Sequence, residues 1–513
     1  MGVRTDASQD RYDVIVIGGG IGGLAAAATL AETGRKVLLV ERHDRAGGYG
    51  HAFKRRKYTF DSAVHMITGA EPGPLGGAAL VDGLLSLLKV RDRCEFRKVD
   101  PLYGVAFPGF RLEVPSGPGW LDAHAERFPH ERHGLRRLQR LTRLLAREVL
   151  TIPAEMSTDD LDARDDLALL REHRTSTVGE VFDRYLDDPH LKAVLSALWP
   201  YVGVPPSRAA FSFWAIMLMS HVDLGGYYCV ASFQRLVDAL ASGLTDRGGE
   251  ILLRSSVRRI LVDENRVTGV QLDNGQRVSA PVVVSNVDPL QTFEELVGTE
   301  QVADRAYLAH LRGLQPSLSA AVLYLATDLD VAQDGVLAHE TFLYDSWDHD
   351  DSYRRILRGE ATALSVTVPT LVDPELAPAG QHLVVATALV PYDAVTSWRG
   401  AKPALESAIL EQVGTLIPGL SERVRFREGG TPRTMERYTL NLSGSIYGWD
   451  QTPEQSGTDR LPHRTPVEGL FLSGHWTQPG GGVQSVLTSG IHTAELVSGE
   501  NLMAALFPAL RSA

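Results

Sequence analysis

The chain has few cysteines and no long apolar run. Only Cys94 and Cys229 occur among its 513 residues, which excludes a disulfide scaffold and a multi-cysteine zinc site. Residues 1–11 are polar and lack the apolar core of a signal peptide. The longest strongly apolar stretch, Ala210–Met219, is far shorter than the roughly 20 residues that cross a bilayer. We therefore predict a cytoplasmic protein.

Positive charge is also scarce. Lys and Arg number 51 against 63 Asp and Glu, which gives a formal net charge of −12. Proteins that bind nucleic acids usually carry a basic face or a high isoelectric point, so we expect no nucleic-acid partner. Nothing in the composition indicates an oligomeric state.

Two segments leave a peripheral membrane contact open. Ala210–Met219 is interpreted either as a buried helix or as an apolar wall that faces lipid or a long lipophilic substrate. Leu135–Leu150 places arginines opposite leucines on a helix, a pattern typical of a solvated surface helix and also of a helix on anionic lipid.

Motifs for metal binding and for a nucleophilic serine are missing as well. The sequence contains no HExxH, CxxC or GxSxG pattern, so we predict no metal site and no nucleophile elbow. What is abundant is glycine, with 49 residues whose densest clusters lie near the two ends of the chain.

The first glycine cluster has the spacing of a dinucleotide-binding turn. A predicted strand, Val14–Ile17, precedes the turn, and an alanine-rich helix is predicted from about residue 22 to residue 33. A second strand, Lys36–Val40, ends in Glu41. The GxGxxG glycines stand between the first strand and the helix, so the segment is a complete βαβ fingerprint: Gly18, Gly20 and Gly23, with Gly22 also at the helix start.

Each of these residues has a physical role in such a turn. Gly18 permits the tight turn, Gly20 lets the backbone approach a pyrophosphate, and Gly23 lets the helix pack on the strand. The helix N-terminus offers free N–H groups and a partial positive charge to phosphates. Glu41 is placed to accept hydrogen bonds from ribose hydroxyls and disfavours a 2′-phosphate at this position.

A second glycine pair, Gly47 and Gly48, favours FAD over NAD. Adjacent glycines leave bare backbone along which a longer ligand can pass. The stretch VERHDRAGGYG that contains them resembles the extended FAD-binding motif of the amine oxidase and phytoene desaturase flavoproteins. Three further blocks are similar to the phytoene desaturase, carotenoid isomerase and retinol saturase branch of these flavoproteins: Ala231–Pro289, Thr431–Gly448 and Gly469–Val497.

The resemblance implies an α/β fold in which a Rossmann-type FAD-binding domain carries a discontinuous α+β substrate domain, a mixed sheet capped by helices. We assign residues 1–95, 230–296 and 431–513 to the FAD-binding domain. Residues 96–229 and 297–430 are assigned to the substrate domain. The turn-rich stretch Asp450–Arg464 is predicted to be a surface loop.

The resemblance also implies further cofactor contacts. The backbone of Val257 would contact adenine, with core packing as the equal alternative. Gly474, Gly482 and Val483 would contact the flavin where PGGG opens a helix whose dipole faces the ring. The family usually has an arginine where this chain has Tyr49; Arg42, Arg45 or Arg55 is expected to compensate, unless the helix dipole carries more of the charge. His475 stands where many FAD proteins have an acid.

The chemistry expected from the resemblance is FAD-dependent desaturation, saturation or isomerisation of C–C bonds in a lipophilic polyene. The alternatives are a natural-product tailoring enzyme that acts on a polyketide-derived polyene, with NADPH as reductant and reductive cyclisation, and, less favoured, an amine oxidase. A non-catalytic flavoprotein is a fourth reading. Candidate acid or base groups are His65, Tyr228 and His475, with Tyr227 and Arg208 as weaker candidates.

Overall fold

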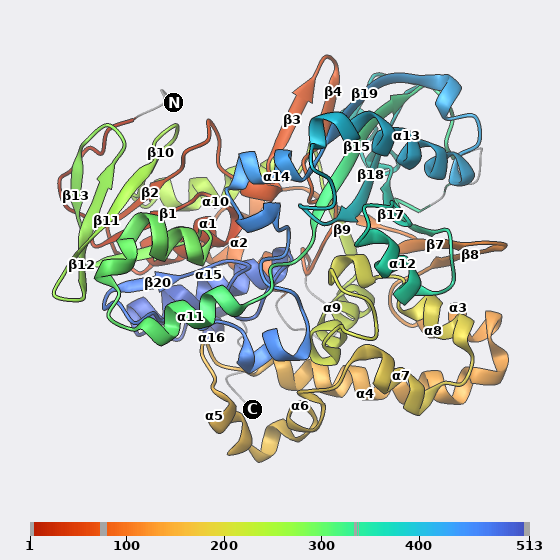
Figure 1. Cartoon of the computed structure of the whole chain (residues 1–513), viewed down its shortest axis with the longest axis horizontal. Coiled ribbons are helices and arrows are strands. Elements are labelled where there is room, and N and C mark those ends of the chain that lie inside the picture. Colours follow the sequence, from red (N-terminus) through yellow and green to blue (C-terminus); the bar gives the residue numbers. More distant parts are fainter. Residues whose placement is uncertain (1–4, 72–78, 333–335, 337, 507–513) are drawn as a thin grey trace.

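The computed structural model describes residues 5–71, 79–332, 336 and 338–506 (Figure 1). The outermost ends of the assigned FAD-binding segments, residues 1–4 and 507–513, lie outside this range. One half of the molecule is built on a five-stranded parallel sheet in the order β10-β2-β1-β14-β20. Its strands are β1 (Val14–Ile17), β2 (Val37–Val40), β10 (Glu250–Leu252), β14 (Val282–Ser285) and β20 (Leu470–Leu472). They come from the start, the middle and the end of the chain.

The predicted βαβ fingerprint is confirmed. β1 and β2 flank helix α1 (Ile21–Glu32), which packs against α10 (Gln234–Thr245) and α15 (Val483–Ser498). The alanines of α1 are buried, and their small side chains let the neighbouring helices approach closely. A three-stranded antiparallel sheet stands beside this half, at the left of Figure 1: β11 (Val257–Asp263), β12 (Arg266–Leu272) and β13 (Arg277–Ser279).

The other half is built on a seven-stranded mixed sheet in the order β19-β15-β18-β17-β16-β7-β8. Strands β16 and β7 pair in parallel, whereas the other neighbours pair antiparallel. The strands are β7 (Tyr103–Phe107), β8 (Phe110–Val114), β15 (Ser319–Thr327), β16 (Glu340–Tyr344), β17 (Ala363–Thr367), β18 (His382–Val390) and β19 (Val424–Gly430).

A group of helices lies along the bottom of Figure 1, below the mixed sheet and extending towards the other half: α3 (Gly119–Arg127), α4 (Arg132–Leu150), α5 (Thr158–Asp162), α6 (Ala168–His173), α7 (Val178–Tyr185), α8 (Pro189–Leu195) and α9 (Phe211–Leu224). The sheet and these helices form the mixed sheet with a helical cap that the sequence predicts. The expected apolar stretch forms most of α9, and half of its side chains are buried. None of the helices in the described ranges is both long and apolar enough to cross a bilayer.

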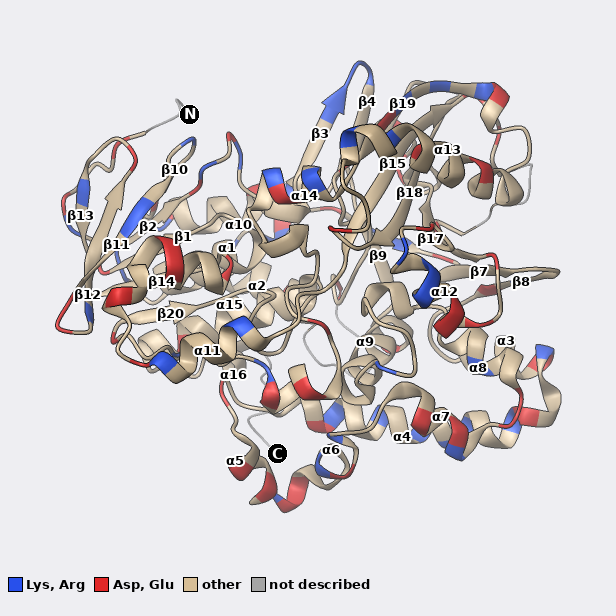
Figure 2. Ribbon diagram, viewed as in Figure 1, with Lys and Arg blue, Asp and Glu red and all other residues tan. Residues whose placement is uncertain are grey.

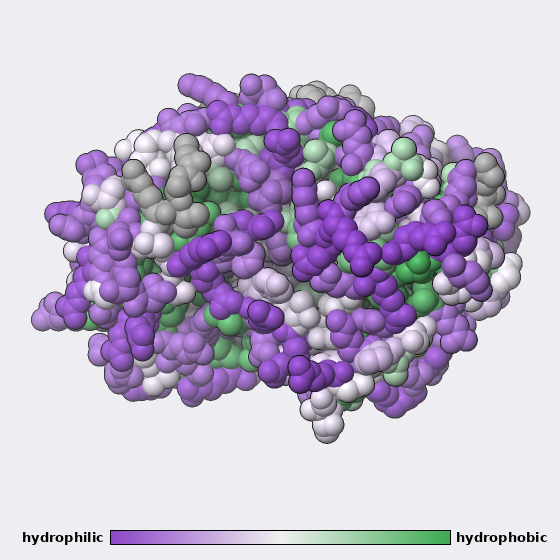
Figure 3. Space-filling model, turned by 90° about the horizontal axis from the view of Figure 1, so that it is seen from above, coloured by the Kyte–Doolittle hydropathy of each residue, from purple (hydrophilic) through white to green (hydrophobic). Residues whose placement is uncertain are grey.

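The other strands and helices lie outside the two large sheets. A hairpin, β3 (Ala52–Arg55) and β4 (Tyr58–Asp61), rises between the two halves, and a small sheet joins β5, β9 and β6. The remaining strands and helices have these bounds: β5 (Ile67–Thr68), β6 (Phe96–Val99), β9 (Gly226–Cys229), α2 (Leu80–Leu87), α11 (Arg305–Gly313), α12 (His349–Ile356), α13 (Trp398–Leu416), α14 (Pro432–Thr439) and α16 (Leu502–Leu506). Figure 3 shows one face, where hydrophilic residues dominate and hydrophobic ones lie recessed between them.

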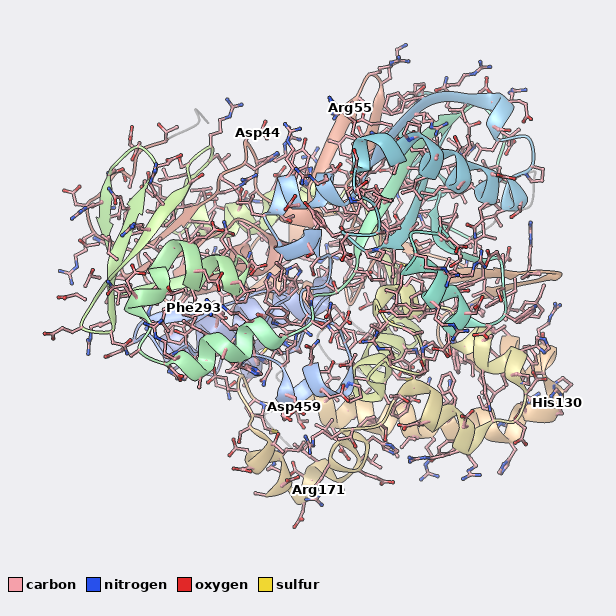
Figure 4. All side chains as sticks on the ribbon, viewed as in Figure 1. Asp44, Arg55, His130, Arg171, Phe293 and Asp459 are labelled. Atoms are coloured by element: carbon pink, nitrogen blue, oxygen red, sulfur yellow. The ribbon has the colours of Figure 1, made fainter. Side chains whose placement is uncertain are left out.

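Ion pairs connect segments that are distant in sequence. Arg55 on β3 pairs with Glu428 on β19 at 2.7 Å, and Asp459 pairs with Arg174 at 3.0 Å (Figure 4). Both pairs remain accessible to solvent, fully or in part, so each contributes about 1 kcal/mol or less.

The prediction that Asp450–Arg464 is a surface loop is wrong. Asp450 and Arg460 are almost completely buried. The guanidinium of Arg460 donates to main-chain carbonyls of Tyr447 at 3.1 Å, of Gln455 at 3.1 Å and of Thr477 at 3.2 Å. A buried cation is tolerated because these carbonyls satisfy its donors. Turn-rich composition cannot reveal such a contact between residues far apart in the chain.

Candidate functional site

One large cavity runs from the parallel sheet to the mixed sheet. Its volume is about 1260 Å³, which exceeds the roughly 300–1,000 Å³ of ordinary small-molecule pockets. One arm, here called the cofactor arm, is lined by the glycine turn, the end of β2 and the N-terminus of α15. The other, the substrate arm, is lined by α9 and by strands β15, β17 and β18. The cavity is large enough for a dinucleotide cofactor and a substrate together.

The first glycine turn forms one wall of the cofactor arm. Gly18 has φ +93°, a conformation that L side chains rarely adopt, and its N–H donates to the carbonyl of Val40 at 2.9 Å. Gly20 and Gly22 line the cavity at the N-terminus of α1. Gly23 does not line it; a Cβ there would lie 2.1 Å from the carbonyl oxygen of Gly18, so Gly23 allows helix and strand to touch.

Glu41 faces the same arm and holds the turn in place. Its Oε2 accepts the N–H of Gly19 and its Oε1 accepts the N–H of His43, both at 2.7 Å. Because a carboxylate has about four lone-pair sites, these bonds leave acceptor capacity for a ligand hydroxyl.

The second glycine pair contacts the first. The N–H of Gly47 donates to the carbonyl of Gly19 at 2.7 Å, and Gly47 and Gly48 both have positive φ. Arg42 and Arg45 line the cavity nearby, as does Tyr49. Two cations therefore stand beside the glycine turns, although no arginine follows the pair itself.

The C-terminal block completes the cofactor arm. Gly474, Gly482 and Val483 all line the cavity, and Val257 lines it from the start of β11. Gly482 caps α15 with φ +95°, and no atom lies within 4 Å of the position where its Cβ would be. The N-terminus of this helix is thus open to the cavity.

These residues fit a flavin adenine dinucleotide. Two helix N-termini, bare glycine backbone and an acid at the end of β2 meet in one elongated cavity, which is the donor set that a pyrophosphate, a ribose and a reducible ring require. Bound FAD supplies hydride-transfer chemistry at this position. The described residues contain no group of three or more His, Cys, Asp or Glu that could hold a metal ion.

The predicted acid and base candidates lie in different surroundings. His65 lines the cavity. Tyr228 lies outside it: its side chain is fully buried and its hydroxyl donates to Asp61 at 2.5 Å. The weaker candidates Tyr227 and Arg208 also lie outside the lining. None of these three residues lines the cavity, so a catalytic role for Tyr228, Tyr227 or Arg208 has no support from this geometry and stays a prediction.

His475 lines the cavity, but its environment opposes a positive charge. Burial, together with repulsion from Arg460, lowers the pKa of His475 to about 3. A neutral imidazole cannot serve as a proton donor of imidazolium strength at neutral pH. A catalytic role for His475 stays a prediction, restricted to the neutral form.

A buried acid that the sequence did not reveal stands behind His65. Glu340 is fully buried, and its Oε1 lies 3.0 Å from Nε2 of His65. The hydroxyls of Tyr201 and Ser365 both donate to the Glu340 carboxylate. Tyr201 and Ser365 line the cavity, so these four residues form a polar cluster at the wall of the substrate arm, here called the Glu340 cluster.

Opposing effects set the pKa values in the Glu340 cluster. Burial alone would lower the pKa of His65, but attraction to Glu340 and its hydrogen bond outweigh burial and raise it. Burial alone would raise the pKa of Glu340, but His65 and the two hydroxyls hold it at about 2. Both shifts favour an imidazolium paired with a carboxylate.

Apolar side chains line much of the rest of the substrate arm. Phe213, Ile216 and Met217 of α9 line it on one side, and Val322 and Leu389 of the mixed sheet line it on the other. No short motif identifies Tyr201 or Glu340, because a single tyrosine and a single glutamate in apolar segments have no characteristic spacing.

Comparison with known proteins agrees with this geometry. Residues 21–498 match the family of flavin containing amine oxidoreductases. The chain is 26% identical to a chloroplastic prolycopene isomerase of Arabidopsis thaliana, over 97% of this chain and 84% of the relative. It is 27% identical to a lycopene-forming phytoene desaturase of Pseudescherichia vulneris, over 94% and 98%. It is 26% identical to an all-trans-retinol 13,14-reductase of Danio rerio, over 90% and 82%.

Solved structures share the fold. Cyclohexylamine oxidase from Brevibacterium oxydans superimposes with a TM-score of 0.64 at 16% identity, over 95% of this chain and 99% of that one. The family match spans most of the chain, and the relatives include both desaturase and reductase. This chain is an FAD-dependent oxidoreductase that belongs to the flavin containing amine oxidoreductase family and resembles its phytoene desaturase branch.

Proposed function

We propose that the protein changes the saturation of C–C bonds in a lipophilic polyene. The observation that carries this proposal is the continuity of the two arms: the apolar substrate arm opens directly into the glycine-lined cofactor arm. A dry apolar space beside a flavin suits an extended hydrocarbon substrate, because the desolvation of such a chain is favourable. The names of the relatives, which include a phytoene desaturase and a retinol reductase, point in the same direction.

A second candidate is a natural-product tailoring enzyme that reduces and cyclises a polyketide-derived polyene with NADPH. The Glu340 cluster favours this alternative, because a carotene has no polar group that could meet charged and hydroxyl side chains. A polyketide-derived polyene carries oxygen functions that could.

Amine oxidation receives less support from the same cluster. An alkylammonium group in the substrate arm would face the positively charged ring of His65, while the balancing carboxylate of Glu340 is fully buried behind it.

We also infer that the protein rests on a membrane at the mouth of the substrate arm. Val149, Leu150 and Ile152 line the cavity, and Leu150 is 57% exposed, so the arm reaches the surface at the end of α4. Basic residues recur along this helix (Figure 2). An apolar rim with arginines beside it suits anionic lipid, from which a lipophilic substrate could enter.

The proposed reaction is tested with holoenzyme under nitrogen. Addition of NADPH is expected to bleach the flavin absorption near about 450 nm, and all-trans-retinol added next is expected to restore it, with products identified by mass spectrometry. The variant Ile216→Asp places a charge in the substrate arm, so it should keep the bleaching and lose the restoration. Bleaching without any turnover of retinol, of a carotene or of an oxygenated polyene would overturn the proposal.

A further inference from the structure

The hydrogen-bond partners of His65 favour a doubly protonated ring in the resting protein. Its Nδ1 lies 2.8 Å from the carbonyl oxygen of Ala63, and its Nε2 lies 3.0 Å from Oε1 of Glu340. Neither a carbonyl nor a carboxylate carries a hydrogen, so both ring nitrogens must donate. Tyr201 has one hydroxyl hydrogen and gives it to Oε2 of Glu340, so it can only accept from His65. In its resting state the Glu340 cluster therefore holds a transferable proton on His65 and contains no free base.

Tyr201 is the member of the Glu340 cluster that can pass this proton to a substrate. Both N–H groups of His65 point at protein acceptors, and the ring is fixed by them. Tyr201 lines the cavity, and its hydroxyl, which can rotate about the C–O bond, stands 3.1 Å from Nε2 of His65. Ser365 is the other hydroxyl on Glu340, but within the described residues it makes no hydrogen bond to His65.

The neighbouring titratable groups do not compete for the proton. His221 and His339 face His65 from α9 and from the residue before β16, and burial lowers the pKa of both, that of His339 to about 4. Asp61 lies farther back, where burial raises its pKa to about 7 and where Tyr228 donates to it. Among the described residues, Glu340 is the carboxylate paired with His65, so a proton that leaves the cluster comes from this pair.

We propose that Tyr201 is the catalytic proton donor of a double-bond reduction, that His65 replaces its proton, and that Glu340 is the positioning residue that keeps His65 charged. This inference rests on the proposed function. The π electron pair of a substrate C=C bond forms a new C–H bond to the proton of Tyr201 as the O–H bond breaks. Bound FAD would supply the hydride for the adjacent carbon, with a reduced nicotinamide as the source of its electrons. The proton on Nε2 of His65 moves to the Tyr201 oxygen, and water then restores His65.

Tyrosine alone is a weak acid, and the position of His65 removes this difficulty. Burial beside a carboxylate raises the pKa of Tyr201 well above the ordinary tyrosine value. A phenolate would therefore be costly, but an imidazolium at 3.1 Å supplies its proton as the first one leaves. Negative charge thus never accumulates on Tyr201.

Stopped-flow measurements with holoenzyme and all-trans-retinol separate the two half-reactions. Tyr201→Phe and His65→Gln should each slow the oxidation of the reduced flavin by retinol by about 100-fold or more, the scale of general acid catalysis. The reduction of the flavin by NADPH should stay within about twofold. Tyr344→Phe is the matched control, because its buried hydroxyl donates to the carbonyl of Ala197 outside the cavity. If retinol oxidises the reduced flavin of Tyr201→Phe as fast as that of the wild-type protein, the proposal is wrong.

The role of Glu340 is tested through the pH profile of the same step. Glu340→Gln should move the loss of activity at alkaline pH to lower pH, because His65 then loses its proton more easily, and Glu340→Asp should restore part of the profile. A merely structural role would lower the rate at all pH values without moving the profile, which would overturn the assignment.

A substrate-free measurement keeps this inference separate from the proposed function. In ¹⁵N-histidine NMR spectra at pH 7, the His65 signals should be those of an imidazolium in the wild-type protein and of a neutral ring in Glu340→Gln. A neutral His65 in the wild-type protein would exclude the relay even if retinol is reduced. A charged His65 in a protein that turns over no polyene would retain the cluster as a proton store and remove only the reaction proposed for it.

Discussion

The Oε2 atom of Glu41 accepts the backbone N–H of Gly19 at 2.7 Å and so ties the end of β2 to the glycine turn. Glu41→Ala removes this bond and the one to the N–H of His43. Hydrogen bonds to charged groups contribute about 1.5–3 kcal/mol each. We expect FAD to bind about 10- to 100-fold more weakly, measured as the dissociation constant of the reconstituted apoprotein. The exposed Glu113→Gln should bind FAD as the wild-type protein does; equal loss in both variants would contradict the role of Glu41.

Gly23→Ala should destabilise the βαβ unit. The added Cβ would lie 2.1 Å from the carbonyl oxygen of Gly18, so helix α1 must move away from β1. Such overpacking costs about 1–3 kcal/mol, which urea unfolding of the apoprotein would detect. The control is Gly414→Ala on α13, where no atom lies within 4 Å of the added Cβ. Alanine there should stabilise by up to about 1 kcal/mol. Similar unfolding midpoints for the two variants would count against the close contact.

The pair of His65 and Glu340 predicts a stability that depends on pH. The pKa of His65 is raised from 6.5, so its contribution is complete below pH 6.5 and is lost as pH rises through the raised value. The pKa of Glu340 is lowered from 4.5 to about 2, so its contribution is complete above pH 4.5 and is lost as pH falls toward 2. The pair therefore stabilises the fold most between pH 4.5 and pH 6.5.

Glu340→Gln should remove this dependence. Loss of one partner of a buried pair costs about 3 kcal/mol or more. The free energy of unfolding of the wild-type protein should therefore exceed that of the variant by this amount near pH 5.5. The difference in the free energy of unfolding should narrow as pH rises from 6.5 through the raised pKa of His65. Urea unfolding of both proteins across this pH range measures the difference. Parallel curves of unfolding free energy against pH would show that the pair does not cause the pH dependence.

The mouth of the substrate arm predicts binding to anionic vesicles. Leu144 and Leu150 are 40% and 57% exposed on α4, where basic residues lie beside them. Leu144→Ser combined with Leu150→Ser should reduce co-sedimentation with vesicles that contain phosphatidylglycerol by about 10-fold, because apolar area is lost from the contact. Leu357→Ser, at an exposed leucine after α12, is the control. Wild-type protein that stays in solution with such vesicles would rule out the membrane contact.

Local patterns in the sequence were sufficient for the cofactor arm. Gly18, Gly23 and Glu41 act within one βαβ unit, so strand, turn and helix bring them together without help from distant segments. The C-terminal glycines follow the same logic, because Gly482 precedes the helix whose N-terminus it opens.

The substrate arm depended on contacts between distant residues. Tyr201 ends a short 3-10 helix, Trp199–Tyr201, after α8, and Glu340 is the first residue of a buried strand. Neither has a neighbour in sequence that reveals its partner. Tyr228 looked suitable beside the flavin segment, but the pairing of β9 with β5 and β6 turns it toward Asp61. Arg460 is buried rather than exposed because carbonyls from separate loops accept its hydrogen bonds.

The amino-acid sequence alone was enough to predict the residues of the glycine turns, because backbone conformation and helix ends depend on neighbours a few positions away. The fold class and the cofactor were predicted from these turns together with the family resemblance. The tertiary structure alone revealed the proton-bearing cluster. A carboxylate can stay charged in an apolar wall only if donors from other segments surround it, and Glu340 acquires His65, Tyr201 and Ser365 only when strands β16 and β17, the segment after β4 and the turn after α8 are packed together.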